Sequence, residues 1–120
     1  MSFSEITMIG FIGNDPELKY TKNNTAVLTL SVGVSERLKA TAPKDLKPKT
    51  FWHKSRRWGK RAETDKTNLK KGDKVFIKGH LIYDSWEDRA GRKHKDAVIE
   101  IDYLEKMLFE NITISLGDES

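Results

Sequence analysis

The side chains of this chain with the clearest capacity for chemistry are three tryptophans and the basic residues near them. If the segment 52–58 is a β-strand, Trp52, Lys54, Arg56 and Trp58 share one face, because side chains alternate in direction along a strand. An apolar core would not hold two unpaired cations, since burying an unpaired charge is costly. This face therefore suits a ligand with flat rings and regular negative charges, which describes single-stranded nucleic acid.

Stacking of a base on an aromatic side chain contributes about 1–3 kcal/mol and works with every base. Lysine and arginine between the rings can contact phosphates. Two alternatives stay open for this strand. One tryptophan could fill a barrel end while the cations only keep the strand soluble, and a slip in register at Arg56 and Arg57 would change which arginine joins the face. Trp86, just before a predicted hairpin tip, could reach over a bound strand or anchor a sheet end.

The charge of the chain is unevenly distributed. From residue 44 to residue 61 there are eight lysines and arginines against one acid, whereas residues 100–120 hold six acids against one lysine. Concentrated positive charge in the middle of the chain favours a polyanionic partner. The chain has no cysteine, which excludes disulfides, thiolate metal sites and a cysteine nucleophile and fits a reducing compartment.

The sequence predicts no catalytic site, no metal site and no membrane-spanning segment. His53, His80 and His94 lie on separate segments without the spacing of metal ligands. No nucleophile, base and orienting acid combine into a catalytic motif, so we expect neither an enzyme nor a cofactor. The sequence has no signal peptide and no segment near the roughly 18 apolar residues of a membrane span, which predicts a cytoplasmic protein without a membrane partner.

Hydrophobic alternation and turn residues predict a chain of short strands. We expect strands over 5–13, 25–35, 50–58, 75–86 and 94–103, an extended piece over 17–21, and one short helix over 62–69. Gly72 can close the helix in a left-handed conformation, and Gly79 can mark a bulge. The order predicts an all-β, five-stranded OB-fold, a Greek-key barrel with the helix between strands 3 and 4. A five-stranded sandwich remains the alternative.

The length of 120 residues allows one domain. We assign residues 1–110 to the OB-fold domain and residues 111–120 to a short flexible C-terminal tail.

Five sequence segments occur in a fixed order with characteristic spacing. They are Ile9-Gly10 with Gly13-Asn14-Asp15-Pro16, then Thr25-Ala26-Val27, then Trp52-His53 with Gly59-Lys60, then Leu69-Lys70-Lys71-Gly72-Asp73 through Gly79, and finally Trp86. Together they span roughly residues 5 to 108, and they resemble the bacterial and mitochondrial single-stranded DNA-binding protein family. The resemblance implies an OB-fold that wraps single-stranded DNA, without sequence preference, during replication, repair and recombination. It also implies a homo-oligomer, with a tetramer favoured over a dimer.

The resemblance assigns roles residue by residue. It implies base stacking by Trp52, Trp58 and Trp86, and a place near a subunit interface for His53. Contacts to the DNA backbone are implied for four basic residues, Lys54, Lys60, Lys70 and Lys71; the strand alternation adds Arg56.

This chain departs from the family in three places. Leu38 stands where a further stacking aromatic is common, and Ser55 and Arg57 replace apolar residues on the inward side of the tryptophan strand. The chain ends without the acidic, hydrophobic tip of similar bacterial proteins, which argues against tail-mediated recruitment of other proteins. Two further hypotheses stay open, a protein-interaction module and an RNA-binding OB domain.

Overall fold

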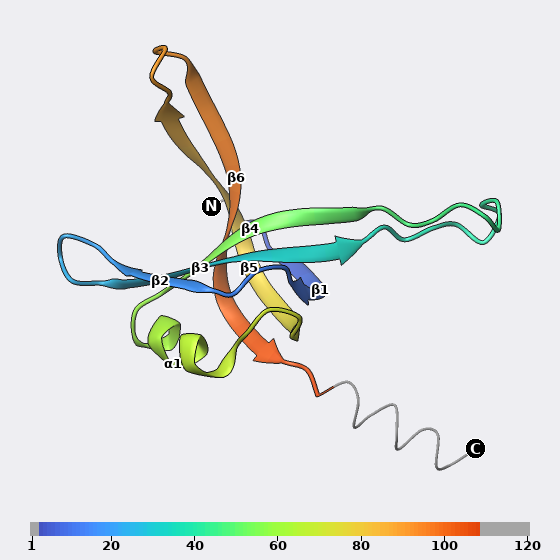
Figure 1. Ribbon diagram of the computed structural model, residues 1–120, viewed down its shortest axis with the longest axis horizontal. Coiled ribbons are helices and arrows are strands. Elements are labelled where there is room, and N and C mark those ends of the chain that lie inside the picture. Colours follow the sequence, from blue (N-terminus) through green and yellow to red (C-terminus); the bar gives the residue numbers. More distant parts are fainter. Residues whose placement is uncertain (1–2, 109–120) are drawn as a thin grey trace.

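The computed structural model describes residues 3–108 of the chain, which form six strands and one helix (Figure 1). The elements are β1 (Ile6–Ile12), β2 (Glu17–Tyr20), β3 (Ala26–Ser35), β4 (Thr50–Trp58), α1 (Lys60–Asn68), β5 (Lys74–Glu87) and β6 (Lys93–Lys106). The predicted tail over 111–120 lies outside the described residues. In the described part, no helix has the length and apolar character that a membrane crossing requires.

Five of the strands close into a ring. The sheet order is β1-β5-β6-β4-β3-β2, and β1 also pairs with β3 through Phe11 and Ile12. All pairings are antiparallel except that of β4 with β6, which run parallel at Lys54, Ser55 and Arg56. A closed ring with one parallel pair, and a helix between its third and fourth strands, is the OB-fold barrel. The predicted fold class is therefore confirmed, and the sandwich alternative is wrong.

The differences from the predicted elements are small and local. The extended piece is a true strand, β2, which pairs with β3 outside the ring. The helix occupies Lys60–Asn68 rather than 62–69, and β5 and β6 run past their predicted ends. The predicted bulge is present, because the β5–β6 register shifts between Lys78 and Gly79. Gly72 has a positive φ of 93°, but the prediction that it closes the helix is wrong. The helix ends at Asn68 with Leu69 in an extended conformation, and Gly72 lies in the turn that follows.

The core lies inside the ring, where alternate residues of the strands point inward. Its buried members are Met8, Ile12, Ala26, Leu28, Leu30, Val32, Ala62, Leu69, Val75, Ile77, Ile99 and Ile101. Helix α1 contributes Ala62 and closes one end of the barrel. Burial of apolar area at roughly 25 cal/mol per Å² makes this core the main stabilising contribution to the fold.

Two hairpins project from the ring in different directions (Figure 1). One is the extension of β3 and β4, and the other is the β5–β6 hairpin, whose tip is ordered by Asp88. The Asp88 carboxylate accepts hydrogen bonds from the backbone N–H groups of Ala90 and Arg92, both at 2.9 Å. The outer surfaces of β4 and of the β5–β6 hairpin carry the three tryptophans.

Candidate nucleic-acid interface

The face of β4 that points away from the barrel holds the four residues singled out in the sequence. Trp52 and Trp58 are 57% and 41% exposed, and Lys54 is exposed between them. Their neighbours Ser55 and Arg57 are buried on the inner side, which fixes the register and rules out a slip at the two arginines. Neither β4 tryptophan fills the barrel end, because both rings lie on its outer surface.

Trp52 lies across two glycines that the sequence reading did not connect with it. Gly33 of β3 is its direct cross-strand partner. A Cβ atom at Gly33 would stand 2.8 Å from the Trp52 ring, and one at Gly13 would stand 2.2 Å from it. Only glycine leaves room for the ring at these two positions, so the backbone supports one face of the indole while the rest of the side chain stays exposed.

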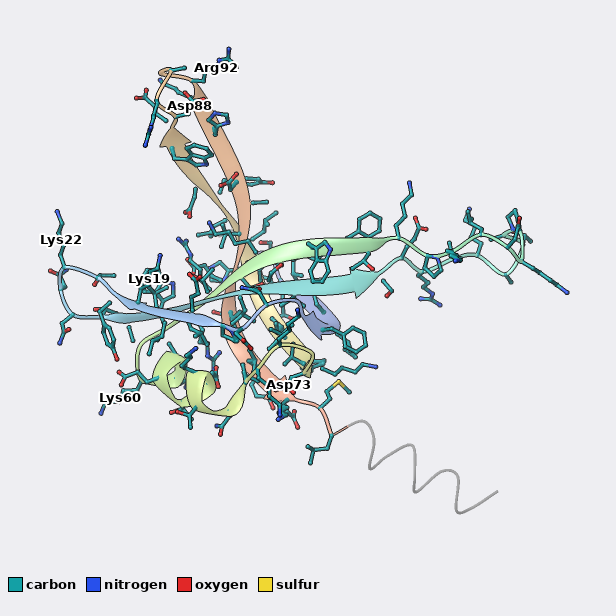
Figure 2. All side chains as sticks on the ribbon, viewed as in Figure 1. Lys19, Lys22, Lys60, Asp73, Asp88 and Arg92 are labelled. Carbon is teal, nitrogen blue, oxygen red and sulfur yellow. The ribbon has the colours of Figure 1, made fainter. Side chains whose placement is uncertain are left out.

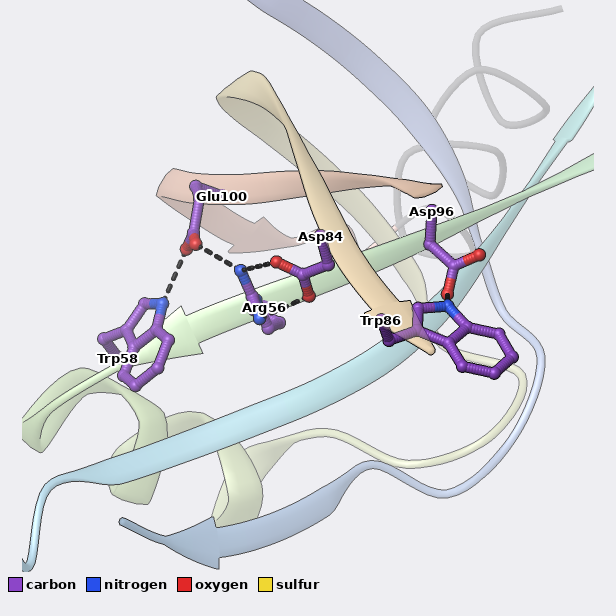
Figure 3. Close-up of polar contacts among 6 residues, drawn as sticks. All are labelled: Arg56, Trp58, Asp84, Trp86, Asp96 and Glu100. Atoms are coloured by element: carbon purple, nitrogen blue, oxygen red, sulfur yellow. Dashed lines mark hydrogen bonds and ion pairs between the residues drawn. The ribbon is translucent and has the colours of Figure 1, made fainter. Parts of the chain in front are cut away.

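Trp58 and Arg56 belong to an ion-pair network with two acids (Figure 3). The Arg56 guanidinium donates two hydrogen bonds to Asp84, at 2.8 and 3.2 Å, and one to Glu100 at 2.8 Å. Glu100 also accepts the indole N–H of Trp58 at 2.6 Å. The Arg56 side chain is only 18% exposed, and its Cζ lies 5.5 Å from the centre of the Trp58 ring. Arg56 is thus a paired cation, not the free one that the sequence reading expected.

Trp86 is held on the β5–β6 hairpin by its cross-strand neighbours. His94 stacks on it, with ring centres 4.3 Å apart and an interplanar angle of 18°. The indole N–H donates to Asp96 at 2.9 Å (Figure 3). His94 in turn contacts the Asp88 carboxylate at 2.8 Å. The ring is 47% exposed, so it is fixed in place and still open to a ligand.

The four lysines expected to contact phosphates are all exposed. Lys60 begins α1, two residues after β4 ends at Trp58, and its side chain projects from the helix start (Figure 2). Lys70 and Lys71 are exposed in the turn after α1. That turn is tied to the loop beneath Trp52, because the Lys71 backbone N–H donates to Asp15 at 3.0 Å. Lys54 lies between the two β4 tryptophans on the same face of the strand.

His53, Ser55 and Arg57 point to the other side of β4. His53 is half-buried, whereas Ser55 and Arg57 are buried. Arg57 lies 3.2 Å from the Asp65 carboxylate of α1 and donates to the Ile101 carbonyl at 3.4 Å. The ion pair with Asp65 accounts for the charged residue Arg57 on the inner side of β4, because it joins β4 to α1. Burial raises the pKa of the Asp65 carboxyl, although the guanidinium groups of Arg57 and Arg61 oppose that shift.

A cleft of about 520 Å³ opens beside Trp58. It is lined by Arg57, Trp58, Arg61, His80, Ile82, Glu100, Ile101 and Asp102. Within residues 3–108, no three side chains of the metal-ligating types come together in a way that could hold a metal ion. Trp58 thus lines this cleft together with charged side chains such as Arg61 and Asp102.

The sequence reading missed the acids Asp84, Asp96 and Glu100. Strand alternation contained a signal for two of them, since Asp84 lies two residues before Trp86 and Asp96 lies two residues after His94. Each therefore shares a face with the aromatic residue that it follows or precedes.

Comparison with protein-family models matches residues 3–107 to the single-strand binding protein family. The match covers all seven elements of the fold and all three tryptophans. The chain belongs to the single-strand binding protein family.

Proposed function

We propose that this protein binds single-stranded DNA without sequence preference, by stacking bases on Trp52, Trp58 and Trp86. The observation that carries the proposal is that all three indole rings are 41–57% exposed and yet individually held. A ring fixed before binding loses little conformational entropy when a base stacks on it. Stacking does not read hydrogen-bonding groups, so every base can be accepted.

Phosphate contacts in this proposal come from exposed lysines. They are Lys54, Lys60, Lys70 and Lys71, all of which are exposed. Arg56 contributes differently, since its charge is already balanced by Asp84 and Glu100. We assign it a supporting role beneath Trp58, with phosphate contact left to the lysines.

The physiological role that we propose is protection of single-stranded DNA in replication, repair and recombination, in the cytoplasm. The basis is family membership together with the sequence-tolerant chemistry of the surface. We propose a binding role for this surface and not a catalytic one, on the basis of membership of the single-strand binding protein family. Recruitment of other proteins by a C-terminal tail forms no part of the proposal.

We further propose that the protein is a homo-oligomer, with a tetramer favoured over a dimer. In the described part of the chain, β1 pairs with β5 from Ile6 to Phe11 but with β3 only at Phe11 and Ile12. An edge with free backbone groups can add a strand from a second copy. Ile9 and Phe11 of β1 are 47% and 48% exposed, which is consistent with apolar contact between subunits. His53 is proposed to lie near such an interface.

Tryptophan fluorescence tests the DNA-binding proposal. Addition of oligo(dT) should quench the emission, and the affinity should fall with salt at a slope of about −0.7 per phosphate neutralised. Matched RNA oligomers added in parallel distinguish an RNA-binding domain. The double variant Trp52→Ala, Trp58→Ala should lose about 2–6 kcal/mol of binding free energy, at about 1–3 kcal/mol per base. Normal binding by that variant would overturn the stacking assignment.

A further inference from the structure

The surface between Trp58 and Trp86 carries more negative than positive charge. Three carboxylates lie there, those of Asp84, Asp96 and Glu100, and the cation that contacts two of them is Arg56 (Figure 3). We call these four side chains the acidic floor. The chain as a whole has a net charge of +4, so the sign of this floor is opposite to that of the protein. It is also the wrong sign for attracting a phosphate.

The carboxylates of the acidic floor are held in place. Glu100 is bound by both Arg56 and the Trp58 indole, and its side chain is 17% exposed. Asp84 accepts two hydrogen bonds from the Arg56 guanidinium, and Asp96 accepts the Trp86 indole N–H. These contacts leave the carboxylates little freedom to turn away when a ligand approaches. A fixed negative charge beside a stacking ring repels a phosphate but leaves an uncharged base free to bind.

The exposed cations border the acidic floor: Lys54 of β4 is in register with Val98, between Asp96 and Glu100 of β6. Lys60 starts the helix beyond Trp58, and Lys71 lies in the turn tied to the loop beneath Trp52. A strand that satisfies both sets of charges must place its bases over the acidic floor and its phosphates toward the lysines. Single-stranded DNA can adopt that arrangement, because its bases are free to face the protein. Duplex DNA cannot, because it turns its phosphates outward at one charge per about 1.7 Å.

We propose that Asp84, Asp96 and Glu100 are specificity-determining residues that exclude phosphate from the space between Trp58 and Trp86. They thereby favour a single strand bound with its bases inward over a duplex. The inference rests on the proposed function, since it concerns how the same surface chooses between two forms of DNA. Discrimination by repulsion of the wrong ligand is a general route to specificity, separate from attraction of the right one.

The test is the double variant Asp84→Asn, Glu100→Gln in the full chain. Asparagine and glutamine keep a side-chain oxygen for the Arg56 and Trp58 donors while removing two negative charges. Dissociation constants are measured at one salt concentration for oligo(dT) of 30 nucleotides and for a blunt duplex of 30 base pairs. We expect the duplex affinity to rise at least tenfold and the single-strand affinity to change less than threefold.

A matched control removes two charges elsewhere. Glu17→Gln, Glu63→Gln alters exposed residues on β2 and α1, away from the acidic floor. This control should change the two affinities by the same factor, leaving their ratio unchanged. Equal ratios in the two double variants would overturn the inference. If wild-type protein does not bind oligo(dT) at all, the proposed function itself fails.

A second variant, Asp96→Asn, tests the proposal if the Asp84→Asn, Glu100→Gln protein does not fold. Asp96→Asn removes one charge from the acidic floor and leaves an oxygen for the Trp86 indole N–H. Circular dichroism shows which variant is folded. With Glu17→Gln as its single-charge control, Asp96→Asn should raise duplex affinity at least threefold more than single-strand affinity. An unchanged ratio in the folded Asp96→Asn protein would contradict the proposal.

Discussion

Trp52 and the pair formed by Trp58 and Trp86 are exposed to similar extents, but the protein holds them by different means. Trp52 lies on backbone, across Gly13 and Gly33, where no side chain intervenes. Trp58 and Trp86 donate their indole N–H groups to Glu100 and Asp96. The first support is steric and carries no charge, while the second is polar and negatively charged. One surface thus combines an uncharged support for Trp52 with a negatively charged support for Trp58 and Trp86, so the two should respond differently to mutation, salt and pH.

The largest effect should come from filling the space beneath Trp52. In Gly33→Val, the new Cβ would stand 2.8 Å from the indole ring and force it to move. We expect the binding free energy for single-stranded DNA to weaken by up to the contribution of one stacked base, about 1–3 kcal/mol. Fluorescence titration with oligo(dT) measures the change. The control is Thr29→Val, on the same strand and face; equal affinities for the two variants would show that the glycine support is irrelevant to binding.

Salt dependence should separate the free from the paired cation on β4. Lys54→Gln should reduce the magnitude of the slope of log affinity against log salt by about 0.7, because one phosphate contact is lost. Arg56→Gln should leave the slope unchanged, since Asp84 and Glu100 already balance the Arg56 charge. Titrations at several salt concentrations provide both slopes. An equal reduction in the two variants would mean that Arg56 contacts a phosphate in the complex.

A smaller effect should appear at acidic pH, and only on the hairpin that carries Trp86. The hydrogen bond from His94 and those from the backbone of Arg92 and Ala90 lower the pKa of the Asp88 carboxyl below its ordinary value of 3.8. Because the folded-state pKa is lowered, the contribution of Asp88 to stability is present above the ordinary value and is lost as pH falls through the lowered one.

Amide hydrogen exchange measures this pH effect. The amides of Ala90 and Arg92, which donate to Asp88, should lose protection in acid. The Gly13 amide near Trp52 donates to the Ser31 carbonyl, which does not titrate, and should keep its protection. Asp88→Asn should abolish the acid-dependent step. A step of the same size at Gly13 would indicate general unfolding and not a local difference.

The local parts of the fold could be predicted from the sequence. Alternation assigned the outer face of β4 correctly, because the direction of a side chain along a strand depends only on its position. The bulge at Gly79 also followed from local chemistry, whereas the cap predicted at Gly72 did not form, because the helix ends at Asn68. The limits of the helix were less certain, since its weak amphipathic pattern leaves the ends to tertiary contacts.

The supports of the tryptophans could not be predicted in the same way. Arg56 meets Asp84 and Glu100 from positions 28 and 44 residues further along the chain, so only the closed ring brings them together. The partner of the buried Arg57 is Asp65 of α1, which required the placement of the helix. The need for glycine at positions 13 and 33 became visible only when the Trp52 ring was placed over them.

The most direct test of the central claim follows the three indole N–H signals in a ¹⁵N-tryptophan-labelled protein. Three tryptophans provide three resolvable signals, one for each proposed stacking ring. On titration with oligo(dT), we expect all three signals to shift together and to saturate at the same ratio of DNA to protein. If oligo(dT) binds and all three signals remain unchanged, base stacking on this surface is contradicted.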